Sequence, residues 1–418
     1  MSYITIKGNR PLVGEVTVQG AKNSVLPILA ASLLCRTPSY IHGCPRITDV
    51  QACSRILNHL GCRIKREDDC LMVDATTLSC THIPDELMGE MRSSIVFLGA
   101  ILGRCGQTRL TFPGGCELGP RPIDLHLNAL TQMGATIREQ GAQLVCQARE
   151  LTGCEILLPI PSVGATENIM IAASVAKGTT VIRNAAREPE IADLARFINR
   201  CGGKVRGYEE GTIVIEGVEQ LYGCEHRVIP DRIVATTYLA GVAITGGNSV
   251  LRNVNAGHLD PILPVFRQCG CNLTVAEDAI VIQAPHSLQN MPQIVTGYYP
   301  GFPTDGQPMM MAMATLAKGT SIFIENIFEN RYNHISDLMR MGAKIKVEGR
   351  MAVVEGVPRL RGGRVKACDL RGGAALVVAA LAAQGETRIT ALHHLDRGYD
   401  ALTDCLQAVG ACIYRVTE

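Results

Sequence analysis

Runs of small and aliphatic residues with helical spacing recur along the chain, separated by shorter stretches in which every second residue is apolar. Residues 26–34 and 376–383 show the helical pattern, and residues 321–324 show the alternation typical of a strand. A glycine followed by a polar residue, as at Gly319-Thr320, stands at the turn before such a strand. The pattern predicts alternating helices and strands, an α/β protein.

One short motif marks this alternation six times: an apolar residue or cysteine, a glycine, a small residue, a mostly polar residue and an aliphatic one. The glycines are 73, 68, 68, 72 and 68 residues apart, and they are Gly61, Gly134, Gly202, Gly270, Gly342 and Gly410. We expect a helix to end at each of them with a left-handed cap. Each copy is predicted to be helix, strand, helix, strand, strand.

Copies of this size cannot bury two helices and a sheet alone, so they must pack together. Three copies per domain give two similar domains, with a boundary near residues 222–230 and Asp231 opening the first helix of the fourth copy. Loops at corresponding ends of the copies are expected to converge on one face. The repeats alone are also consistent with a purely structural scaffold.

The composition argues against two kinds of partner, nucleic acids and membranes. Lys and Arg number 40 against 39 Asp and Glu, so there is no basic excess for nonspecific binding of nucleic acid or of an anionic membrane. The longest apolar run, residues 374–383, is too short to cross a bilayer, and the polar start is unlike a signal peptide. We therefore expect a cytoplasmic protein without nucleic-acid or membrane partners.

The cysteines predict reduced thiols. There are 17 of them, an odd number, and no C-x-x-C pair occurs, which argues against a disulfide framework and against a zinc site. We expect most of them to pack as small apolar residues in a core that contains no Trp.

The first candidate for chemistry is the start of the first helix. Lys22 and Asn23 stand where free backbone N–H groups and the helix dipole favour an anion. The alternative is a solvated lysine beside an asparagine cap.

A second candidate is the loop of residues 113–126, which holds three glycines and three prolines around Cys116 and Arg121. A thiol between glycines and near an arginine is suited to exposure and to a lowered pKa, as a proton donor or nucleophile requires. The alternative is that Cys116 is one more structural cysteine.

Acidic residues in the fifth and sixth copies are further candidates. Asp305 follows Thr304, and Thr304 with Gln307 would form a capping box, in which case Asp305 is only a first-turn acid. Asp369 precedes the first helix of the last copy.

Six cations occupy loops or helix starts in a chain that is otherwise neutral: Lys22, Arg92, Arg121, Arg331, Arg371 and Arg397. As a set they predict a multiply charged anionic ligand, such as a phosphate with a carboxylate. The alternative is six unrelated surface charges.

Several segments together resemble the enolpyruvyl transferase family, and within it the UDP-N-acetylglucosamine 1-carboxyvinyltransferases. The similarity runs from Ile4 to Ile413, and its most specific segments are residues 20–23, 113–116, 121–126, 162–168, 186–190, 302–305, 329–331 and 396–399.

The resemblance implies a two-domain inside-out α/β barrel with three copies per domain. One domain would hold residues 22–229, and the other residues 1–21 and 230–418. The active site would lie between them and close on the sugar nucleotide. The implied substrates are phosphoenolpyruvate and UDP-N-acetylglucosamine, in the first committed step of peptidoglycan synthesis, with no metal and no organic cofactor.

The resemblance also implies residue roles. Asp305 would accept the proton of the sugar 3-hydroxyl, and Cys116 would protonate the methylene carbon of phosphoenolpyruvate and also hold that compound covalently. The phosphate and carboxylate would be held by Lys22, Arg121, Arg371 and Arg397. Further substrate-binding positions are Asn23, Arg92, Pro122, Ile123, Asp124, Leu125, Ser162, Val163, Gly164, Ile327, Arg331 and Asp369.

The sequence departs from its relatives at two places, and two other functions remain open. Ile160 stands where some relatives have Lys, which leaves the diphosphate contacts open, and Gly372-Gly373 stands where others have Ala-Ser, a change that should affect helix stability more than chemistry. The rivals are transfer of the same group to shikimate 3-phosphate and a catalytically silent paralogue that binds UDP-sugars. Assays with each acceptor would separate them.

Overall fold

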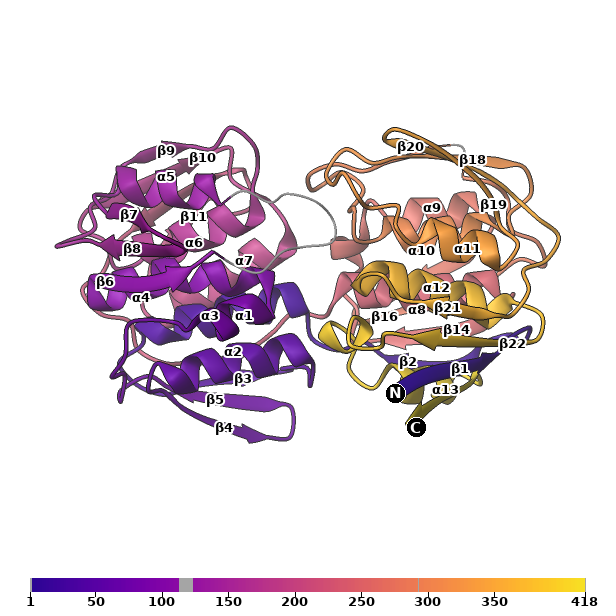
Figure 1. Ribbon diagram of the computed structural model, residues 1–418, viewed down its shortest axis with the longest axis horizontal. Coiled ribbons are helices and arrows are strands. Elements are labelled where there is room, and N and C mark those ends of the chain that lie inside the picture. Colours follow the sequence, from indigo (N-terminus) through magenta and orange to yellow (C-terminus); the bar gives the residue numbers. More distant parts are fainter. Residues whose placement is uncertain (1, 113–122, 292, 418) are drawn as a thin grey trace. The chain divides into compact units, whose positions relative to one another are not determined.

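The computed structural model describes residues 2–112, 123–291 and 293–417. Within them the chain forms two compact units, one of residues 20–112 and 123–229, called here the Lys22 unit, and one of residues 2–19 and 230–417, called the Asp305 unit. Each is a mixed α/β unit with three copies of the repeat (Figure 1). No helix in the described ranges is long and apolar enough to span a membrane.

The Lys22 unit contains the first three copies. The elements of copy one are α1 (Lys22–Ala31), η1 (Ser32–Leu34), β3 (Ser39–His42), α2 (Thr48–His59), β4 (Arg63–Glu67) and β5 (Cys70–Asp74). Those of copy two are α3 (Asp85–Glu90), η2 (Arg92–Val96), α4 (Phe97–Cys105), β6 (Gln107–Thr111), α5 (Asp124–Gln132), β7 (Thr136–Gln140) and β8 (Gln143–Gln147). Those of copy three are β9 (Glu155–Leu157), α6 (Val163–Ala173), β10 (Thr179–Arg183), α7 (Pro189–Arg200), β11 (Lys204–Arg206) and β12 (Thr212–Glu216), followed by β13 (Glu225–Arg227).

The Asp305 unit contains β1 (Ser2–Lys7), β2 (Val13–Thr17) and copies four to six. The elements of copy four are α8 (Arg232–Ile244), β14 (Asn248–Arg252), η3 (Ala256–Leu259), α9 (Leu263–Gln268), β15 (Asn272–Val275) and β16 (Ala279–Gln283). Those of copy five are β17 (Gln293–Val295), α10 (Gln307–Ala314), β18 (Thr320–Ile324), α11 (Ile335–Arg340), β19 (Lys344–Glu348) and β20 (Met351–Glu355). Those of copy six are β21 (Arg364–Lys366), α12 (Leu370–Ala382), β22 (Glu386–Thr390), η4 (Leu395–Arg397), α13 (Leu402–Ala408) and β23 (Cys412–Thr417).

Copies one to five have the predicted order of helix, strand, helix, strand, strand, whereas copy six has a single strand, β23, after its second helix. Most sheets gain one short strand that the sequence pattern did not reveal. In copy three the order is β11-β12-β10-β9, where β9 runs parallel to β10 with Ile156 opposite Ile182, and the other pairs are antiparallel. The extra strand precedes the first helix, so that helix connects two parallel neighbours. In copy two the described residues provide only a bridge between His82 and Arg109 at this place.

Residues near the start of the sequence complete two sheets of the Asp305 unit. Strand β2 pairs in parallel with β14 of copy four, with Val16 opposite Leu251. Strand β1 lies between β22 and β23 of copy six, with Ile4 opposite Ile389 and Ile6 opposite Ile413. Both ends of the described chain therefore belong to one sheet (Figure 1).

The repeated glycine has the same backbone conformation in every copy. Its φ angle lies between 90° and 98° at all six positions, Gly61, Gly134, Gly202, Gly270, Gly342 and Gly410. This is the left-handed region that glycine enters without steric cost. The predicted left-handed cap is thus confirmed in all six copies.

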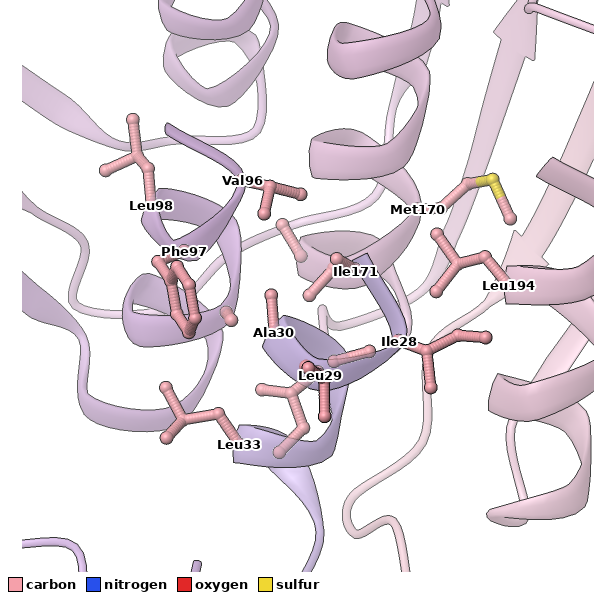
Figure 2. Packing of buried hydrophobic residues seen from close by; sticks show 14 of the residues in the cluster. Ile28, Leu29, Ala30, Leu33, Val96, Phe97, Leu98, Met170, Ile171 and Leu194 are labelled. Carbon is pink, nitrogen blue, oxygen red and sulfur yellow. The ribbon is translucent and has the colours of Figure 1, made fainter. Parts of the chain in front are cut away.

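The first helix of each copy is buried and the second covers a sheet. In the Lys22 unit α1, α4 and α6 pack on one another, and Ile28, Phe97 and Ile171 at their contacts are fully buried (Figure 2). The C-terminal ends of these helices meet, because a Cβ on Gly103 would lie 2.8 Å from Val175 Cγ2 and 3.4 Å from Leu34 Cδ2. Their N-terminal ends are therefore together at the opposite end of the unit.

Helices α8, α10 and α12 form the matching core of the Asp305 unit (Figure 1). A cavity of about 550 Å³ is lined by residues at their C-terminal ends, 243–246, 316–318 and 382 among them. No candidate site residue lines it. The candidate residues of this unit are at the other end of the helices.

Candidate functional site

The candidate residues gather at the N-terminal ends of the buried helices. In the Asp305 unit, Asp231 is the N-cap of α8 and accepts from the N–H groups of Ile233 and Val234, as predicted for the residue that opens copy four. Asp369 is the N-cap of α12, and Asp305 precedes α10 by two residues. Free N–H groups and helix dipoles favour an anion at this end.

Asp305 is bound by two arginines from different copies. Arg331 Nη2 donates to Asp305 Oδ1, and Arg371 donates to Oδ2 from Nε at 3.1 Å and from Nη2 at 3.0 Å. The arginine side chains are 1% and 4% exposed, whereas that of Asp305 is 28% exposed. The sequence-predicted base and two of the predicted cations therefore form one cluster with the carboxylate at its accessible side.

Arg331 is fixed by Thr304, which the sequence pattern assigned to a helix cap, and Thr304 is held by Glu325, which the sequence did not single out. Its Nε donates to Thr304 O and to Thr304 Oγ1, each at 3.1 Å, and Thr304 Oγ1 donates to Glu325 Oε2 at 3.0 Å. Glu325 Oε1 accepts from the N–H of Ile327 at 2.8 Å. Thr304 and Glu325 thus hold both Arg331 and the turn that carries the candidate residue Ile327.

The predicted capping box at Thr304 and Gln307 is wrong. Helix α10 begins at Gln307, its N-cap is Gly306, and no side chain caps it. Thr304 binds Arg331 and Glu325 instead. Asp305 therefore precedes the helix, and its carboxylate can bind the arginines. Hydrogen bonds to charged groups replace the predicted local cap, because they are stronger than a neutral one.

Asp369 supports the cluster from the start of α12. Its Oδ1 accepts from the N–H groups of Arg371 and Gly372, each at 2.9 Å, and lies 3.9 Å from Arg331 Nη1. Burial acts to raise the pKa of Asp369, but Arg331 and the Gly372 N–H outweigh it, so that this pKa is lowered. The carboxylate is ionised at neutral pH and orients both arginine-bearing segments.

Arg371 is held as a cation in a buried place. Burial acts to lower the pKa of its guanidinium, but Asp305, followed by Tyr399 and Asp231, outweighs it, and the pKa is raised. The Tyr399 ring centre lies 6.0 Å from Arg371 Cζ, and the Tyr399 hydroxyl contacts Thr237 Oγ1 at 2.8 Å. A fixed, permanently charged guanidinium is suited to binding a carboxylate or phosphate.

Arg397 lies in η4, next to the start of α12. A Cβ on Gly373 of α12 would be 3.2 Å from Leu395 of η4, which shows how closely the two elements pack. The neighbouring Asp396 pairs with Arg415 through two bonds of 2.7 Å. Arg397 is therefore near the N-terminal end of α12, as the other candidate residues of this unit are.

In the Lys22 unit the first candidate is an ion pair. Lys22 Nζ lies 2.6 Å from Asp49 Oδ2, and both side chains are buried. Asp49 is in the first turn of α2 and was not recognised from the sequence, because a pairing across 27 residues has no local signal. Asn23 is exposed and does not cap α1, whose N-cap is Ala21.

Residues of copies two and three meet around His126. Burial, followed by the charge of Arg92, lowers the pKa of His126 to about 4, with Asp124 acting in the opposite direction. Asn168 Nδ2 lies 3.0 Å from His126 Nδ1, and a Cβ on Gly164 would be 3.1 Å from His126 Cε1. This neutral histidine therefore lies close to three candidate residues, Arg92, Asp124 and Gly164. The sequence did not single it out for this role.

The remaining described candidates of the Lys22 unit also lie at the first residues of helices. Ser162 is the N-cap of α6, where its hydroxyl accepts from the Ala165 N–H at 3.4 Å and Val163 is the first residue. Ile123 precedes α5, which begins at Asp124 and Leu125. Cys116, Arg121 and Pro122 lie outside the described residues.

Gly372 should not tolerate alanine, although alanine favours helices. A Cβ there would lie 2.8 Å from Asp369 Oδ2 and 2.8 Å from Cys368 Sγ. Overpacking costs about 1–3 kcal/mol, whereas alanine gains only about 1 kcal/mol over glycine in a helix. We expect Gly372→Ala to lower the free energy of unfolding by about 1–2 kcal/mol in urea titrations.

Gly89 of α3 provides the matched control. A Cβ there meets nothing within 4 Å, so Gly89→Ala should stabilise the protein by up to about 1 kcal/mol. A Gly372→Ala variant as stable as Gly89→Ala would contradict the packing argument.

Comparisons with known proteins identify the family of the chain. The family of EPSP synthase (3-phosphoshikimate 1-carboxyvinyltransferase) matches residues 6–406, and the chain belongs to this family of enolpyruvyl transferases. Within the family it is 48% identical over 416 residues to UDP-N-acetylglucosamine 1-carboxyvinyltransferase 2 of Caldanaerobacter subterraneus subsp. tengcongensis, with all of both chains covered. It is 42% identical over 418 residues, again over all of both chains, to UDP-N-acetylglucosamine 1-carboxyvinyltransferase of Nitratidesulfovibrio vulgaris (strain DP4).

Solved structures show the same fold. The enolpyruvyl transferase NikO from Streptomyces tendae has a TM-score of 0.91 at 25% identity, covering 100% of this chain and 99% of its own. An EPSP synthase from Acinetobacter baumannii has a TM-score of 0.76 at 18% identity, with all of both chains covered. The predicted enolpyruvyl transferase fold is confirmed.

Proposed function

We propose that the chain transfers the enolpyruvyl group of phosphoenolpyruvate to the 3-hydroxyl of UDP-N-acetylglucosamine and releases phosphate. The observation that carries this proposal is the identity of 42% and 48%, over the whole chain, to relatives named for that activity. The Asp305, Arg331 and Arg371 cluster supports it, because the reaction needs a base beside cations.

In the addition step, Asp305 takes the proton of the sugar 3-hydroxyl. At the same time the oxygen of that hydroxyl attacks the central carbon of phosphoenolpyruvate. A carboxylate has about four lone-pair sites, so Asp305 can accept this proton while the arginines keep its oxygens in place. Cys116 gives its proton to the methylene carbon. The product of this step is a tetrahedral adduct in which the new C–O bond has formed.

In the elimination step, the C–O bond to phosphate breaks and the new methyl group returns a proton to the Cys116 thiolate left by the addition step, which restores the double bond. Negative charge moves onto the departing phosphate, and preorganised cations stabilise it. We assign this role to Lys22, Arg121, Arg371 and Arg397, with Arg331 and Asp369 holding the neighbouring groups. The fixed ion pairs of Lys22 with Asp49 and of Arg371 with Asp305 support the assignment.

We assign the sugar nucleotide to a second set of residues. These are Asn23, Arg92, Arg121, Pro122, Ile123, Asp124, Leu125, Ser162, Val163, Gly164 and Ile327. The gathering of Arg92, Asp124 and Gly164 around His126, at the N-terminal ends of buried helices, supports a site for a negatively charged ligand there. The domain boundaries of 22–229 and of 1–21 with 230–418 are part of this proposal.

The reaction would place the protein in the cytoplasm, in the first committed step of peptidoglycan synthesis and hence in cell-wall growth and division. The decisive test is phosphate release from phosphoenolpyruvate with each of two acceptors. We expect release with UDP-N-acetylglucosamine and none above background with shikimate 3-phosphate. The reverse preference would establish the rival transfer, and no release with either acceptor would favour a silent paralogue.

A further inference from the structure

A group of metal-ligating side chains lies in the Lys22 unit, apart from every residue assigned above. His59, Cys80 and His82 each offer one ligand atom, and the three atoms lie within 4.8 Å of one another. Cys80 Sγ is 3.7 Å from His59 Nε2 and 3.0 Å from His82 Nδ1. The two histidines are exposed and Cys80 is partly buried, so an ion can reach the group from solvent.

We propose that His59, Cys80 and His82 bind a divalent transition-metal ion, Zn²⁺, in a three-ligand site that the transfer reaction does not use. One thiolate and two imidazoles suit this borderline-soft ion. Zn–S bonds of about 2.3 Å and Zn–N bonds of about 2.0 Å place tetrahedral ligand atoms about 3.3–3.6 Å apart. The observed separations of 3.0 and 3.7 Å bracket that range, so small side-chain rotations suffice.

The backbone holds the ligands in place before any ion binds. His59 is the last residue of α2, and the following Leu60 O accepts from the N–H groups of Ser79 and Cys80 at 3.0 and 3.2 Å. Thr77 Oγ1 donates to Gly61 O at 2.7 Å, which fastens the same segment to the left-handed cap. His82 is fixed on its other side by the bridge to Arg109 of β6.

The position also favours a cation electrostatically. His59 is in the last turn of α2, a helix of 12 residues, and the C-terminal end of a helix attracts positive charge. The nearby Arg55, one turn earlier, is engaged by Glu90 through Nε at 3.1 Å to both carboxylate oxygens. An ion here would join copy one to copy two, where copy two shows only a bridge in place of a fourth strand.

The test is metal binding by the full chain after removal of metal with a chelator. Co²⁺ is the spectroscopic probe, because tetrahedral thiolate coordination gives intense absorption, and Zn²⁺ competition then gives the affinity. We expect one tetrahedral Co²⁺ per chain, which Zn²⁺ displaces. Cys80→Ser should abolish the thiolate absorption, and His59→Ala and His82→Ala should each weaken Zn²⁺ binding by about 100-fold or more, since even loss of an outer-shell partner costs about 10- to 100-fold.

Cys154→Ser is the matched control, a partly buried cysteine of the same unit outside the cluster. It should bind Co²⁺ and Zn²⁺ as the unchanged chain does. A Co²⁺ spectrum that survives Cys80→Ser, or one lost equally in Cys154→Ser, would overturn the proposal.

A second measurement does not depend on the folding of the Cys80 variant. In the unchanged chain, Zn²⁺ should slow alkylation of Cys80 measured by peptide mass spectrometry, and His59→Ala should remove this protection. Equal alkylation rates with and without Zn²⁺ would show that the group is only a hydrogen-bonded pair of histidines with a thiol, and would likewise overturn the proposal.

Discussion

Replacing Asp305 with asparagine should lower turnover by about 10²- to 10⁴-fold, the usual contribution of a positioned general base. The amide keeps the shape of the side chain but cannot take the proton of the sugar hydroxyl. Its oxygen can still accept from one of the two arginines, so the sugar nucleotide should bind with little change. Phosphate-release rates and calorimetric titration with UDP-N-acetylglucosamine measure the two effects separately.

Asp404→Asn is the matched control, because it removes one carboxylate from an exposed place on α13 of the same unit. Its turnover should equal that of the unchanged chain. Near-normal turnover of Asp305→Asn would remove Asp305 from the role of base. Loss of sugar-nucleotide binding together with a lowered unfolding temperature would instead assign it a structural role.

Replacing Cys116 with alanine or serine should also remove most of the turnover, because the proposed addition step then lacks its proton donor. The expected loss is again about 10²- to 10⁴-fold for an acid placed at the reacting carbon. Treatment with the epoxide fosfomycin should modify the same thiol, as expected of a reactive thiol that readily forms the thiolate. Mass spectrometry of the treated protein locates the adduct.

The other cysteines serve as internal controls for this result. Burial raises the pKa values of Cys62, Cys269 and Cys271 to about 12, so these thiols are poor nucleophiles at neutral pH. Cys154→Ala should keep both turnover and the fosfomycin adduct. An adduct on any cysteine other than Cys116, or an active Cys116→Ala variant, would contradict the assignment.

Features with a repeating local signal could be predicted from the sequence. The six glycines between Gly61 and Gly410 have left-handed φ angles because a helix must end there, and a side chain would be strained in that conformation. Asp231 and Asp369 cap helices as their positions before apolar runs indicate.

Features that depend on pairing between distant residues could not be predicted. The short strand β9 has only three residues, too few for a periodic pattern, and it is defined by β10 beside it. Asp49 is recognised as the partner of Lys22 only once the fold brings the two together. In the same way, Glu325 is recognised only in the structure as the partner of Thr304, which binds Arg331. The capping box at Thr304 failed for the same reason, since a distant arginine and carboxylate compete for its hydroxyl.

The strand order also means that the two units can complete their folding at different times during synthesis. Residues 20–229 follow one another on the ribosome, so the Lys22 unit can fold as soon as it emerges. Strand β1, although it precedes the Lys22 unit in the chain, has no partner until β22 and β23 exist, almost 400 residues later. At about 5–20 residues per second this strand remains unpaired for roughly 20–80 s. Residues 2–17, which contain β1 and β2, are therefore a stretch that a nascent-chain chaperone could bind before their partner strands are made.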